Sequence, residues 1–435
     1  MAGHPATKCP AGNACRTGNP VSTLLTTPMT PHDPQATSAP APVPFSDGDF
    51  APTGAWQPGD AVGGRRFVEV ANPSRPFTLE GGGTLGSVTM AYETWGELSR
   101  AADNAVLVCH ALTGDAHAAG PIGHGHPTPG WWDDLIGPGR AIDTDEWFVV
   151  CVNVLGGCQG STGPASIDPA TDAPYASGFG VVTMRDIVRA QRHVADQLGV
   201  GVWAAVIGGS MGGMVALEWA VMFPDRVRGL AAIATTAQAS ALQIAWSGVE
   251  RRAIAFDPGW AGGDYYDAPP GRGPHRGLAL ARQIAQVTYR TGPLFEERFG
   301  RSTVDPMDEG LSQWQRFDIE GYLDHHGTKL VRRFDANSYL VLSKAMDLHD
   351  VGRGRGGTAA ALARVTARCL IGSIDSDLLY PPSEQRQLVE GLVAGGASCD
   401  ELTIASPHGH DAFLLEPDQV GPALTALLEE VGNDG

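Results

Sequence analysis

The stretch Gly208-Gly-Ser-Met-Gly212 fits the pattern G-x-S-x-G, and the sequence on either side supports the match. The apolar run 203–207 predicts a buried strand before it, and residues 214–220 predict a helix after it. Strand, sharp turn and helix form the setting in which this pattern exposes a reactive serine. The glycines are needed because such a turn strains the serine backbone and leaves no room for a neighbouring Cβ. We therefore predict that Ser210 is a nucleophile; the alternative is a glycine-rich turn that packs a helix on a sheet.

Short apolar runs, separated by segments of helix length, continue on both sides of this turn. Such runs are typical of parallel strands that are covered on both faces. They lie at 105–109, 147–152, 230–234, 368–371 and 401–404. Three earlier segments alternate in character and predict antiparallel strands, at 66–70, 77–80 and 86–94. We predict an α/β fold with a mostly parallel sheet and helices on both faces, including an amphipathic helix at 186–198.

The chain divides into three kinds of sequence. Residues 1–60 hold eleven of the 32 prolines and lack a sustained apolar period, so we predict a disordered tail. Residues 61–236 and 351–435 carry the strand signals and form the predicted core. Between them, residues 237–350 predict helices, at 243–256, 277–289 and 321–330. Ligands of such sheets bind beyond the carboxyl ends of the strands, so this insertion is a predicted lid.

Composition excludes several classes of protein. The formal net charge of −18 argues against sequence-independent nucleic-acid binding and against docking on an anionic membrane. No apolar run reaches the length of about 18 residues that a transmembrane helix needs, and the N-terminus lacks a secretory h-region. The seven cysteines form no C-x-x-C pair, which predicts neither a zinc site nor a disulfide framework. We expect no bound metal and a cytoplasmic location.

A serine hydroxyl needs a base, itself oriented by a carboxylate, and in α/β folds with this elbow the chain order is serine, acid, histidine. Asp375 and Asp377 both follow the run at 368–371, and His408 and His410 both follow the last predicted strand. The order is therefore satisfied, with two candidates for each role. Each of these residues taken alone is more simply explained as part of a solvated loop.

Two further features bear on chemistry. An oxyanion hole needs two backbone N–H groups, one from the residue after the nucleophile, Met211, and one from the loop after an earlier strand, where Leu112 is the predicted donor.

Arg282 and Tyr289 lie seven residues apart on a predicted helix, so they share a face that can be directed toward the site. An arginine suits a substrate carboxylate. From pattern alone, a surface arginine and a packed tyrosine are the simpler explanation.

The sequence resembles the homoserine O-acetyltransferases, acyltransferases of methionine biosynthesis on the α/β-hydrolase fold. The resemblance runs from about residue 65 to residue 430 and leaves out the proline-rich start. The segment Asn153-Val-Leu-Gly-Gly-Cys-Gln-Gly-Ser-Thr-Gly-Pro164 is far more specific than G-x-S-x-G. Other matching segments are His110-Ala-Leu-Thr-Gly-Asp-Ala-His117, Gly208-Gly-Ser-Met-Gly-Gly-Met214, Phe334-Asp-Ala-Asn-Ser-Tyr339, Asp377-Leu-Leu-Tyr380 and Gly409-His-Asp-Ala-Phe-Leu414.

The resemblance implies a role for each site residue. Ser210 is the acylated nucleophile, Asp377 the acid and His410 the base, which resolves both pairs of candidates. The remaining residues are Leu112 and Met211 at the oxyanion hole, Arg282 for the homoserine carboxylate, Tyr289 and Thr113 near the substrate, and Asp411 for its amino group. Acetyl-CoA and L-homoserine are the implied substrates of a ping-pong reaction without a further cofactor. The resemblance also implies homodimers that pair through the lid.

Three rival functions remain open at this stage. The first is another acyl transfer on the same fold, with succinyl-CoA as donor or serine as acceptor. The second is a plain esterase, and the third is a scaffold without catalysis. The intact serine, acid and histidine argue against the third.

Overall fold

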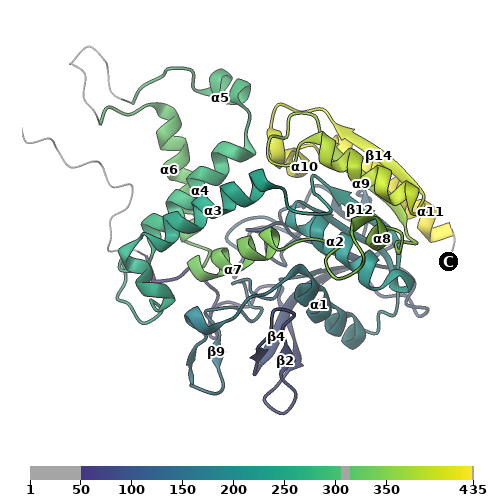
Figure 1. Ribbon diagram of the computed structural model, residues 1–435, viewed down its shortest axis with the longest axis horizontal. Coiled ribbons are helices and arrows are strands. Elements are labelled where there is room, and N and C mark those ends of the chain that lie inside the picture. The colour runs from purple at the N-terminus through teal and green to yellow at the C-terminus, as the bar shows by residue number, and fades with distance from the viewer. Residues whose placement is uncertain (1–49, 305–313, 434–435) are drawn as a thin grey trace, which may run out of the picture. The chain divides into compact units, whose positions relative to one another are not determined.

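Eight strands form the central sheet of the computed structural model, which describes residues 50–304 and 314–433 (Figure 1). From one edge to the other they are β1 (Arg66–Ala71), β4 (Val88–Trp95), β8 (Phe148–Val152), β5 (Ala105–Cys109), β11 (Trp203–Gly209), β12 (Val227–Ile233), β13 (Arg368–Ile374) and β14 (Cys399–Ile404). The pairs β1–β4 and β4–β8 are antiparallel, and the other pairs are parallel. The predicted α/β fold with a mostly parallel sheet is therefore confirmed.

Alternate residues of the parallel strands face two separate apolar layers. On β5, Leu107 packs into one cluster, while Val106 and Val108 pack into the other. The helices α1 (Met184–Leu198), α2 (Met211–Met222), α8 (Thr358–Leu362) and α9 (Pro382–Ala394) belong to the first side. The helix α11 (Pro417–Asn433) covers the second. Burial on both faces explains why the strands are continuous apolar runs rather than alternating ones.

The insertion between β12 and β13 is helical. Its helices are α3 (Ala241–Ala255), α4 (His275–Tyr289), α5 (Gly292–Arg298), α6 (Asp318–Val331) and α7 (Ala336–Asp347) (Figure 1). Helix α4 packs against both α3 and α6, and α7 packs against α3. The predicted helices correspond to α3, α4 and α6, whereas α5 and α7 were not predicted. Helix α5 has only seven residues and carries Pro293 near its start, which weakened the helical pattern there.

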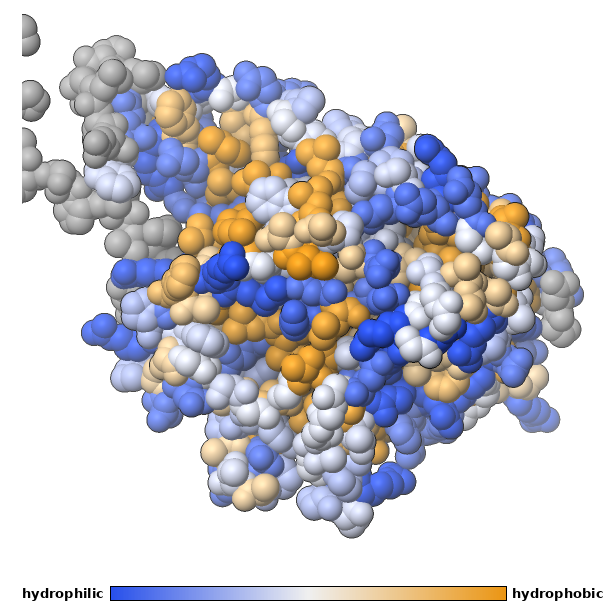
Figure 2. Space-filling model, in the orientation of Figure 1, coloured by the Kyte–Doolittle hydropathy of each residue, from blue (hydrophilic) through white to orange (hydrophobic). Residues whose placement is uncertain are grey.

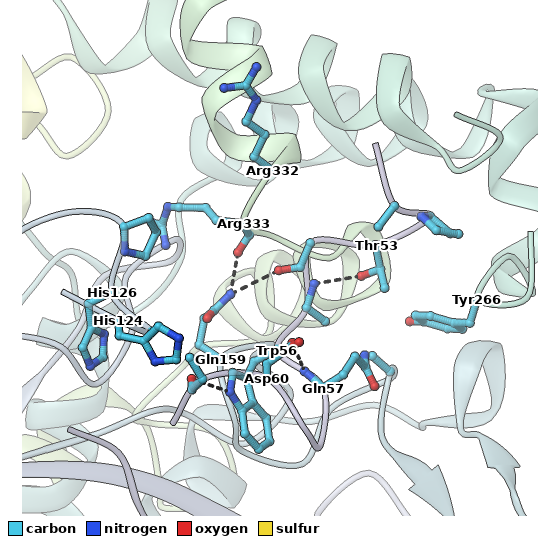
Figure 3. A pocket seen from close by; sticks show the side chains of 18 of the residues that line it. Thr53, Trp56, Gln57, Asp60, His124, His126, Gln159, Tyr266, Arg332 and Arg333 are labelled. Atoms are coloured by element: carbon cyan, nitrogen blue, oxygen red, sulfur yellow. Dashed lines mark hydrogen bonds between the residues drawn. The ribbon is translucent and has the colours of Figure 1, made fainter. Parts of the chain in front are cut away.

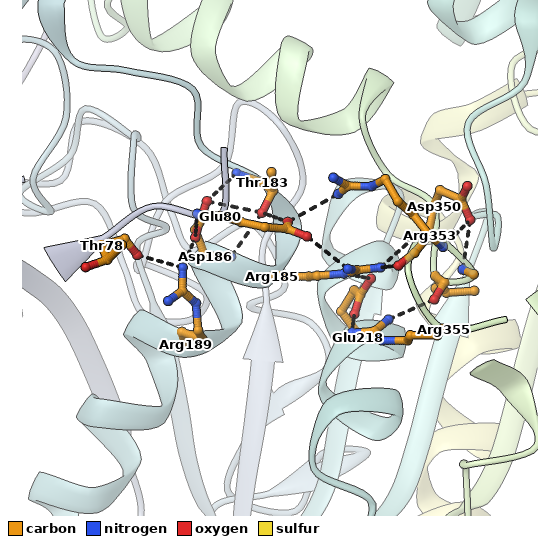
Figure 4. A network of polar contacts seen from close by, with 12 residues as sticks. Thr78, Glu80, Thr183, Arg185, Asp186, Arg189, Glu218, Asp350, Arg353 and Arg355 are labelled. Carbon is orange, nitrogen blue, oxygen red and sulfur yellow. Dashed lines mark hydrogen bonds and ion pairs between the residues drawn. The ribbon is translucent and has the colours of Figure 1, made fainter. Parts of the chain in front are cut away.

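An ion-pair network ties the end of this insertion to the core (Figure 4). Glu218 of α2 is 1% exposed, with its carboxylate 3.3 Å from Arg185 Nε and 2.8 Å from Arg355 Nη2. Arg185, on α1, also donates to the backbone carbonyls of Asp350 and Arg353, in the segment that returns from α7. The buried carboxylate thereby holds the segment that returns from the insertion against the two core helices α1 and α2.

The predicted tail boundary at residue 60 is wrong for residues 50–60, because these residues pack on the folded chain. Thr53 Oγ1 donates to Asp335 Oδ1 at 2.8 Å, and the Trp56 N–H donates to the Cys158 carbonyl at 2.9 Å. Proline and glycine gave this segment the composition of a tail, although it is held by the insertion and by the loop after β8. Residues 1–49 lie outside the described residues.

No helix within 50–304 or 314–433 combines the length and the apolar character that crossing a membrane requires. Shorter elements complete the fold, and one of them, a 3₁₀ turn, contains His410. They are β2 (Phe77–Thr78), β3 (Thr84–Leu85), β6 (Ile136–Gly137), β7 (Ile142–Asp143), β9 (Ile167–Asp168), β10 (Ala173–Pro174), α10 (Ala412–Leu415) and the 3₁₀ turn Gly409–Asp411.

Candidate active site

Ser210 occupies the sharp turn between β11 and α2. Its φ of 57° and ψ of −124° are strained for a residue with a side chain. The turn is tight enough to require its glycines: a Cβ on Gly208 would lie 2.3 Å from the backbone of Gly212, and one on Gly209 would lie 2.4 Å from the Phe413 ring. The Ser210 N–H donates to the Ile233 carbonyl at 2.9 Å, which anchors the turn to β12.

A continuous hydrogen-bonded chain runs from Ser210 to Asp377. His410 Nε2 lies 2.9 Å from Ser210 Oγ, and His410 Nδ1 lies 2.7 Å from Asp377 Oδ2. The other oxygen of Asp377 accepts the N–H groups of Leu379 and Tyr380 at 2.8 and 2.9 Å, so the carboxylate is fixed in orientation. All three triad side chains are at most 5% exposed. The geometry suits removal of a proton from the serine hydroxyl by the imidazole.

The rival candidates for acid and base lie elsewhere. Asp375 Oδ1 accepts the Ser406 N–H at 3.1 Å, which braces the loop after β14. His408 contributes its backbone carbonyl to Arg290. The structure therefore brings Asp377 and His410, and neither Asp375 nor His408, to Ser210.

Aromatic rings enclose the imidazole of His410. Tyr380 stacks on it with ring centroids 5.0 Å apart, and Tyr289 and Phe413 lie 5.5 and 5.9 Å away. Burial by itself lowers the pKa of His410, but the charge and hydrogen bond of Asp377 outweigh it and raise the pKa above the ordinary value of 6.5. A base with a raised pKa accepts the serine proton more readily.

Two backbone N–H groups near Ser210 are the candidates for an oxyanion hole. Met211 is the first residue of α2 and Leu112 lies in the loop after β5, and neither N–H donates a hydrogen bond to any described residue. The two segments approach each other closely, since a Cβ on Gly212 would lie only 2.1 Å from the Cys109 carbonyl oxygen. Only a glycine therefore fits at this position. His110 holds the loop, since its Nε2 accepts the Val154 N–H at 3.1 Å and its Nδ1 lies 2.8 Å from the Ala111 carbonyl. Free, fixed donors of this kind are what oxyanion stabilisation requires.

Arg282 and Tyr289 share a face of α4, as predicted, and that face is directed to the triad. The Arg282 guanidinium lies 5.4 Å from the centre of the Tyr289 ring, which in turn lies against His410. Arg282 and Thr113 line one pocket of about 340 Å³. Among the described residues no carboxylate forms an ion pair with Arg282. A guanidinium without an internal partner is available to a ligand carboxylate.

Asp411, expected to bind a substrate amino group, already has a partner within the chain. Its Oδ2 lies 3.0 Å from Nη2 of Arg290, and both side chains are mostly buried, at 17% and 13% exposure. No pattern in the sequence indicated this pair, because Asp411 ends the 3₁₀ turn before α10 and Arg290 directly follows α4. A carboxylate has two oxygens, so the ion pair leaves acceptor capacity on Oδ1.

Comparisons with known proteins agree with this geometry. The profile of the α/β hydrolase fold matches residues 104–417. The homoserine O-acetyltransferase of Thermobifida fusca is 54% identical over 382 residues, covering 87% of this chain and 97% of that protein. The enzyme of the same name from Leifsonia xyli is 53% identical, covering 86% and 92%. The chain belongs to the homoserine O-acetyltransferase family.

Solved structures place members of this family beside hydrolases. The homoserine O-acetyltransferase of Bacillus anthracis is 30% identical with a TM-score of 0.77, covering 84% of this chain and 97% of that one. Esterase E22 is also 30% identical, with a TM-score of 0.76 and coverage of 84% and 99%. The fold is thus common to acyltransferases and esterases.

One cluster in this member of the family has the composition of a metal site. Glu93, His117 and His126 are buried, and each offers a ligand atom within 4.8 Å of the others. The two imidazole rings stack in parallel, with centroids 3.8 Å apart and planes at 7°. A metal lies near the plane of each imidazole that binds it, at about 2.0–2.1 Å for zinc, and one ion cannot meet that condition for two rings stacked so far apart.

Hydrogen bonds within the chain account for part of the cluster. Glu93 Oε2 lies 3.0 Å from His117 Nδ1, which ties β4 to the segment after β5. His126 Nε2 accepts the Gly64 N–H at 3.0 Å, so Glu93 Oε1, 3.2 Å from that nitrogen, is left without a hydrogen-bond partner. The members of the cluster come from positions 24 and 33 residues apart on separate elements, so no local pattern could have indicated it.

Sequence reasoning also missed Glu250, a buried carboxyl group of α3. Tyr339 donates its hydroxyl to Glu250 Oε2 at 2.9 Å. Burial raises the pKa of Glu250 to about 7, although the Tyr339 hydrogen bond and the nearby Arg282 charge act in the opposite direction. At neutral pH this carboxyl group is therefore only partly ionised, and it lies close enough to Arg282 to feel its charge.

Proposed function

We propose that the chain transfers an acetyl group from acetyl-CoA to the hydroxyl of L-homoserine through an acetyl ester on Ser210. The observation that carries the proposal is the hydrogen-bonded chain Ser210–His410–Asp377 beneath a helical insertion that presents an unpaired Arg282. Membership of the family gives the substrate class. Acetyl-CoA is a co-substrate in this proposal, and no further cofactor takes part.

In the first half-reaction, His410 Nε2 takes the proton of the Ser210 hydroxyl as Oγ attacks the thioester carbonyl. The new C–O bond forms, and the carbonyl oxygen carries negative charge that the Leu112 and Met211 N–H groups bind. The C–S bond then breaks, and His410 returns the proton to the CoA sulfur. Ser210 is left as an acetyl ester. Asp377 stabilises the imidazolium in both directions.

In the second half-reaction, L-homoserine occupies the space that the CoA thiol leaves. Arg282 binds its carboxylate and Asp411 Oδ1 binds its ammonium group, with Thr113 and Tyr289 beside them. His410 takes the homoserine hydroxyl proton, and the resulting oxygen attacks the acetyl ester. The ester bond to Ser210 breaks, and the proton passes from His410 to Oγ. A closed insertion favours this outcome because water competes for the same ester.

We also propose that two copies of the chain pair through the insertion. Apolar side chains are exposed on α3 and α4, where isolated lid helices would be polar. They are Leu242, Ile244, Val249 and Phe256 on or next to α3, and Leu280 and Val287 on α4. Figure 2 shows hydrophobic side chains gathered over the region in which Figure 1 places these helices. Phe256→Asp is expected to give monomers in light scattering, whereas Ile122→Asp, at another exposed apolar site outside the insertion, is expected to leave dimers.

The proposed location is the cytoplasm. Cys109, Cys151, Cys158 and Cys369 are buried free thiols, and Cys399 is a partly buried one. A reducing compartment keeps such thiols free.

A two-by-two assay tests the function. The purified chain is given acetyl-CoA or succinyl-CoA with L-homoserine or L-serine, and free thiol is followed over time. We expect sustained release only for acetyl-CoA with homoserine, and a stoichiometric burst with acetyl-CoA alone. Faster turnover with succinyl-CoA would overturn the donor. Sustained release without any acceptor would favour the esterase alternative, for which the likeness to esterase E22 speaks.

Ser210→Ala is the matched variant for this assay. Loss of the nucleophile in a serine triad lowers kcat by a factor on the order of 10⁶. Mass spectrometry of the wild-type chain with acetyl-CoA alone is expected to detect one added acetyl group, and none on the variant. Unchanged turnover by Ser210→Ala would remove the acyl-serine mechanism.

A further inference from the structure

The pocket next to Arg282 is basic in a chain that is acidic overall. Arg282, His326, Lys329 and Arg333 line it together with Thr113, and no aspartate or glutamate does so. The chain carries a formal net charge of −18, so this concentration of cations is local. Such a pocket attracts anionic ligands by focusing positive potential.

His326, which also lines the pocket, adds no positive charge to it at neutral pH. Its pKa is lowered to about 4 by burial and by the positive charges of Arg282, His325, Arg290 and Lys329. The ring is therefore neutral at pH 7, and the charge in the pocket comes from the arginines and the lysine.

The cations of the pocket differ in how far they are already engaged. Arg333 lies 3.4 Å from Asp115 and donates to the Thr113 carbonyl. Lys329 is exposed and forms no ion pair with a carboxylate within the part of the chain that the structure describes. Lys329 lies in the last turn of α6 and Arg333 two residues beyond its end, and both line the same pocket.

Among the cations that line the pocket, Arg282 is the one that a chain of side-chain contacts connects to the triad. It touches Tyr289, which packs on His410, which bonds Ser210. Homoserine carries one carboxylate, and Arg282 is sufficient for it. Lys329 and Arg333 are positive charges that the acceptor does not require.

A larger cavity lies on the other side of Arg333. Arg333 lines this cavity of about 880 Å³ together with Trp56, His124, Tyr266 and Arg332 (Figure 3). Its volume lies within the range of about 300–1,000 Å³ that is usual for small-molecule sites. The two cavities thus have Arg333 as a common lining residue.

We propose that Lys329 and Arg333 form a subsite for the phosphate groups of the acyl donor, with its nucleoside end extending into the larger cavity. The inference rests on the proposed function, because CoA carries a diphosphate and a 3′-phosphate at the end remote from its thioester. Lys329 is the principal ligand, since Arg333 is already engaged by Asp115. Ammonium and guanidinium groups both bind phosphate oxygens with charge-assisted hydrogen bonds.

The test compares donors with and without phosphate. Lys329→Ala is assayed with acetyl-CoA and with the acetyl thioester of N-acetylcysteamine, which carries the same reactive group and no phosphate. We expect KM for acetyl-CoA to rise roughly five- to tenfold, with kcat and KM for homoserine unchanged. The phosphate-free thioester is expected to react equally well with both proteins. Lys329→Arg keeps the charge and is expected to restore KM to within about twofold.

Lys344→Ala is the matched control, because Lys344 is an exposed lysine of α7 that lines neither cavity. An equal rise in KM for both thioesters, or an equal effect of Lys344→Ala, would overturn the subsite. Acetylated 3′-dephospho-CoA separates the phosphates: a lysine effect that persists with it assigns Lys329 to the diphosphate, and one that vanishes assigns it to the 3′-phosphate.

Failure of the function and failure of the subsite remain distinguishable. A wild-type chain that does not transfer acetyl from acetyl-CoA contradicts the function alone. Calorimetric titration with CoA then decides the subsite: equal affinity of the wild type and Lys329→Ala, or absence of binding by the wild type, overturns it, and weaker binding by the variant supports it.

Discussion

Arg290 and Asp411 form an ion pair, 3.0 Å long, directly beside the catalytic imidazole. Arg290 follows the last residue of α4, and Asp411 follows His410, so the pair links the insertion to the loop of the base. Arg290 also donates to the His408 carbonyl. One oxygen of Asp411 thus holds the end of α4, and in the proposed reaction the other oxygen binds the ammonium group of the substrate.

Asp411→Asn is therefore predicted to act on the acceptor. An amide oxygen binds an ammonium group more weakly than a carboxylate does, and we expect KM for homoserine to rise roughly tenfold or more. KM for the acyl donor is expected to stay within about twofold. Steady-state kinetics with each substrate varied in turn measures both values. Asp267→Asn, at an exposed position of the insertion, is the control, and an equal change in it would refute the assignment.

The two aspartates after β13 are predicted to differ sharply. Asp377→Asn removes the partner of His410 Nδ1 and permits the wrong tautomer, for which a loss of about 10⁴ in kcat is typical. Asp375→Asn weakens only a hydrogen bond from the Ser406 N–H, and we expect kcat to fall less than about threefold. Rates of thiol release from the two purified variants make the comparison. Similar losses in both would show that the oriented pair is not what activates Ser210.

The raised pKa of His410 predicts the pH profile. Burial lowers the pKa, the Asp377 charge and hydrogen bond raise it, and the net value lies above 6.5. Because only the neutral imidazole accepts a proton, kcat/KM is expected to rise with pH through an acid limb centred above 6.5. Rates in overlapping buffers locate it, and a midpoint at or below 6.5 would contradict the pairing.

The same group makes an opposite contribution to stability. A histidine whose pKa is higher in the folded chain than in the unfolded one stabilises the fold below the unfolded pKa, and this contribution is lost as pH rises through the folded pKa. We therefore expect the His410 share of the unfolding free energy to be complete below about pH 6.5. Denaturant titrations of the wild type and His410→Gln at pH 6 and pH 9 measure it, and a difference between them that does not shrink at pH 9 is the contrary result.

Gly212→Ala is predicted to damage the oxyanion hole without touching the triad. Its Cβ would lie 2.1 Å from the Cys109 carbonyl, so the loop that carries Leu112 must move away from Met211. Loss of one oxyanion donor lowers kcat by about 10²–10³. Gly248→Ala is the control, because it lies in α3 with nothing within 4 Å of the new methyl group, and it should stabilise the chain by about 0.5–1 kcal/mol. Full activity of Gly212→Ala would place the hole elsewhere.

Glu218→Ala is predicted to be strongly destabilising. It leaves Arg185 and Arg355 without their buried carboxylate, and breaking a buried pair from one side costs about 3–5 kcal/mol. Glu80→Ala, in the more exposed part of the same network, should cost about 1 kcal/mol or less. Guanidinium titrations measure the loss of unfolding free energy in both variants. A larger loss for Glu80→Ala than for Glu218→Ala would contradict the prediction.

The elbow and the sheet were predictable because their signals are local. The run at 203–207 became the strand Trp203–Gly209, and the predicted helix at 214–220 became Met211–Met222, extended backwards by Gly212 and Gly213. Glycines have low helix propensity, so the first turn of the helix was not predicted. Gly212 and Gly213 occupy this turn because a Cβ at either position would clash with the Cys109 carbonyl or the Thr235 side chain. The bounds were therefore missed where close packing, rather than helix propensity, selects the residue.

The choice within each pair of site candidates needed three dimensions. Asp375 and Asp377 are equally placed by strand order, and only the direction of the turn after β13 aims Asp377 at His410. The partners of Asp411 and Glu93 come from distant elements. Residues 50–60 were misassigned for the same reason, since their binding surface is built from parts of the chain that follow much later.

The placement of Tyr289 on the insertion has a consequence for the fate of the acetyl ester. The imidazole of His410 lies between Tyr380 of the core and Tyr289 of α4, so one wall around the base belongs to the segment between β12 and β13. In the proposed reaction this segment therefore acts, together with Asp411 and Thr113 of the core, on the partition of the acyl-enzyme between water and an amino-acid hydroxyl. Exchanging residues 241–347 with the matching segment of an esterase of the same fold is predicted to shift that partition toward water with the triad untouched.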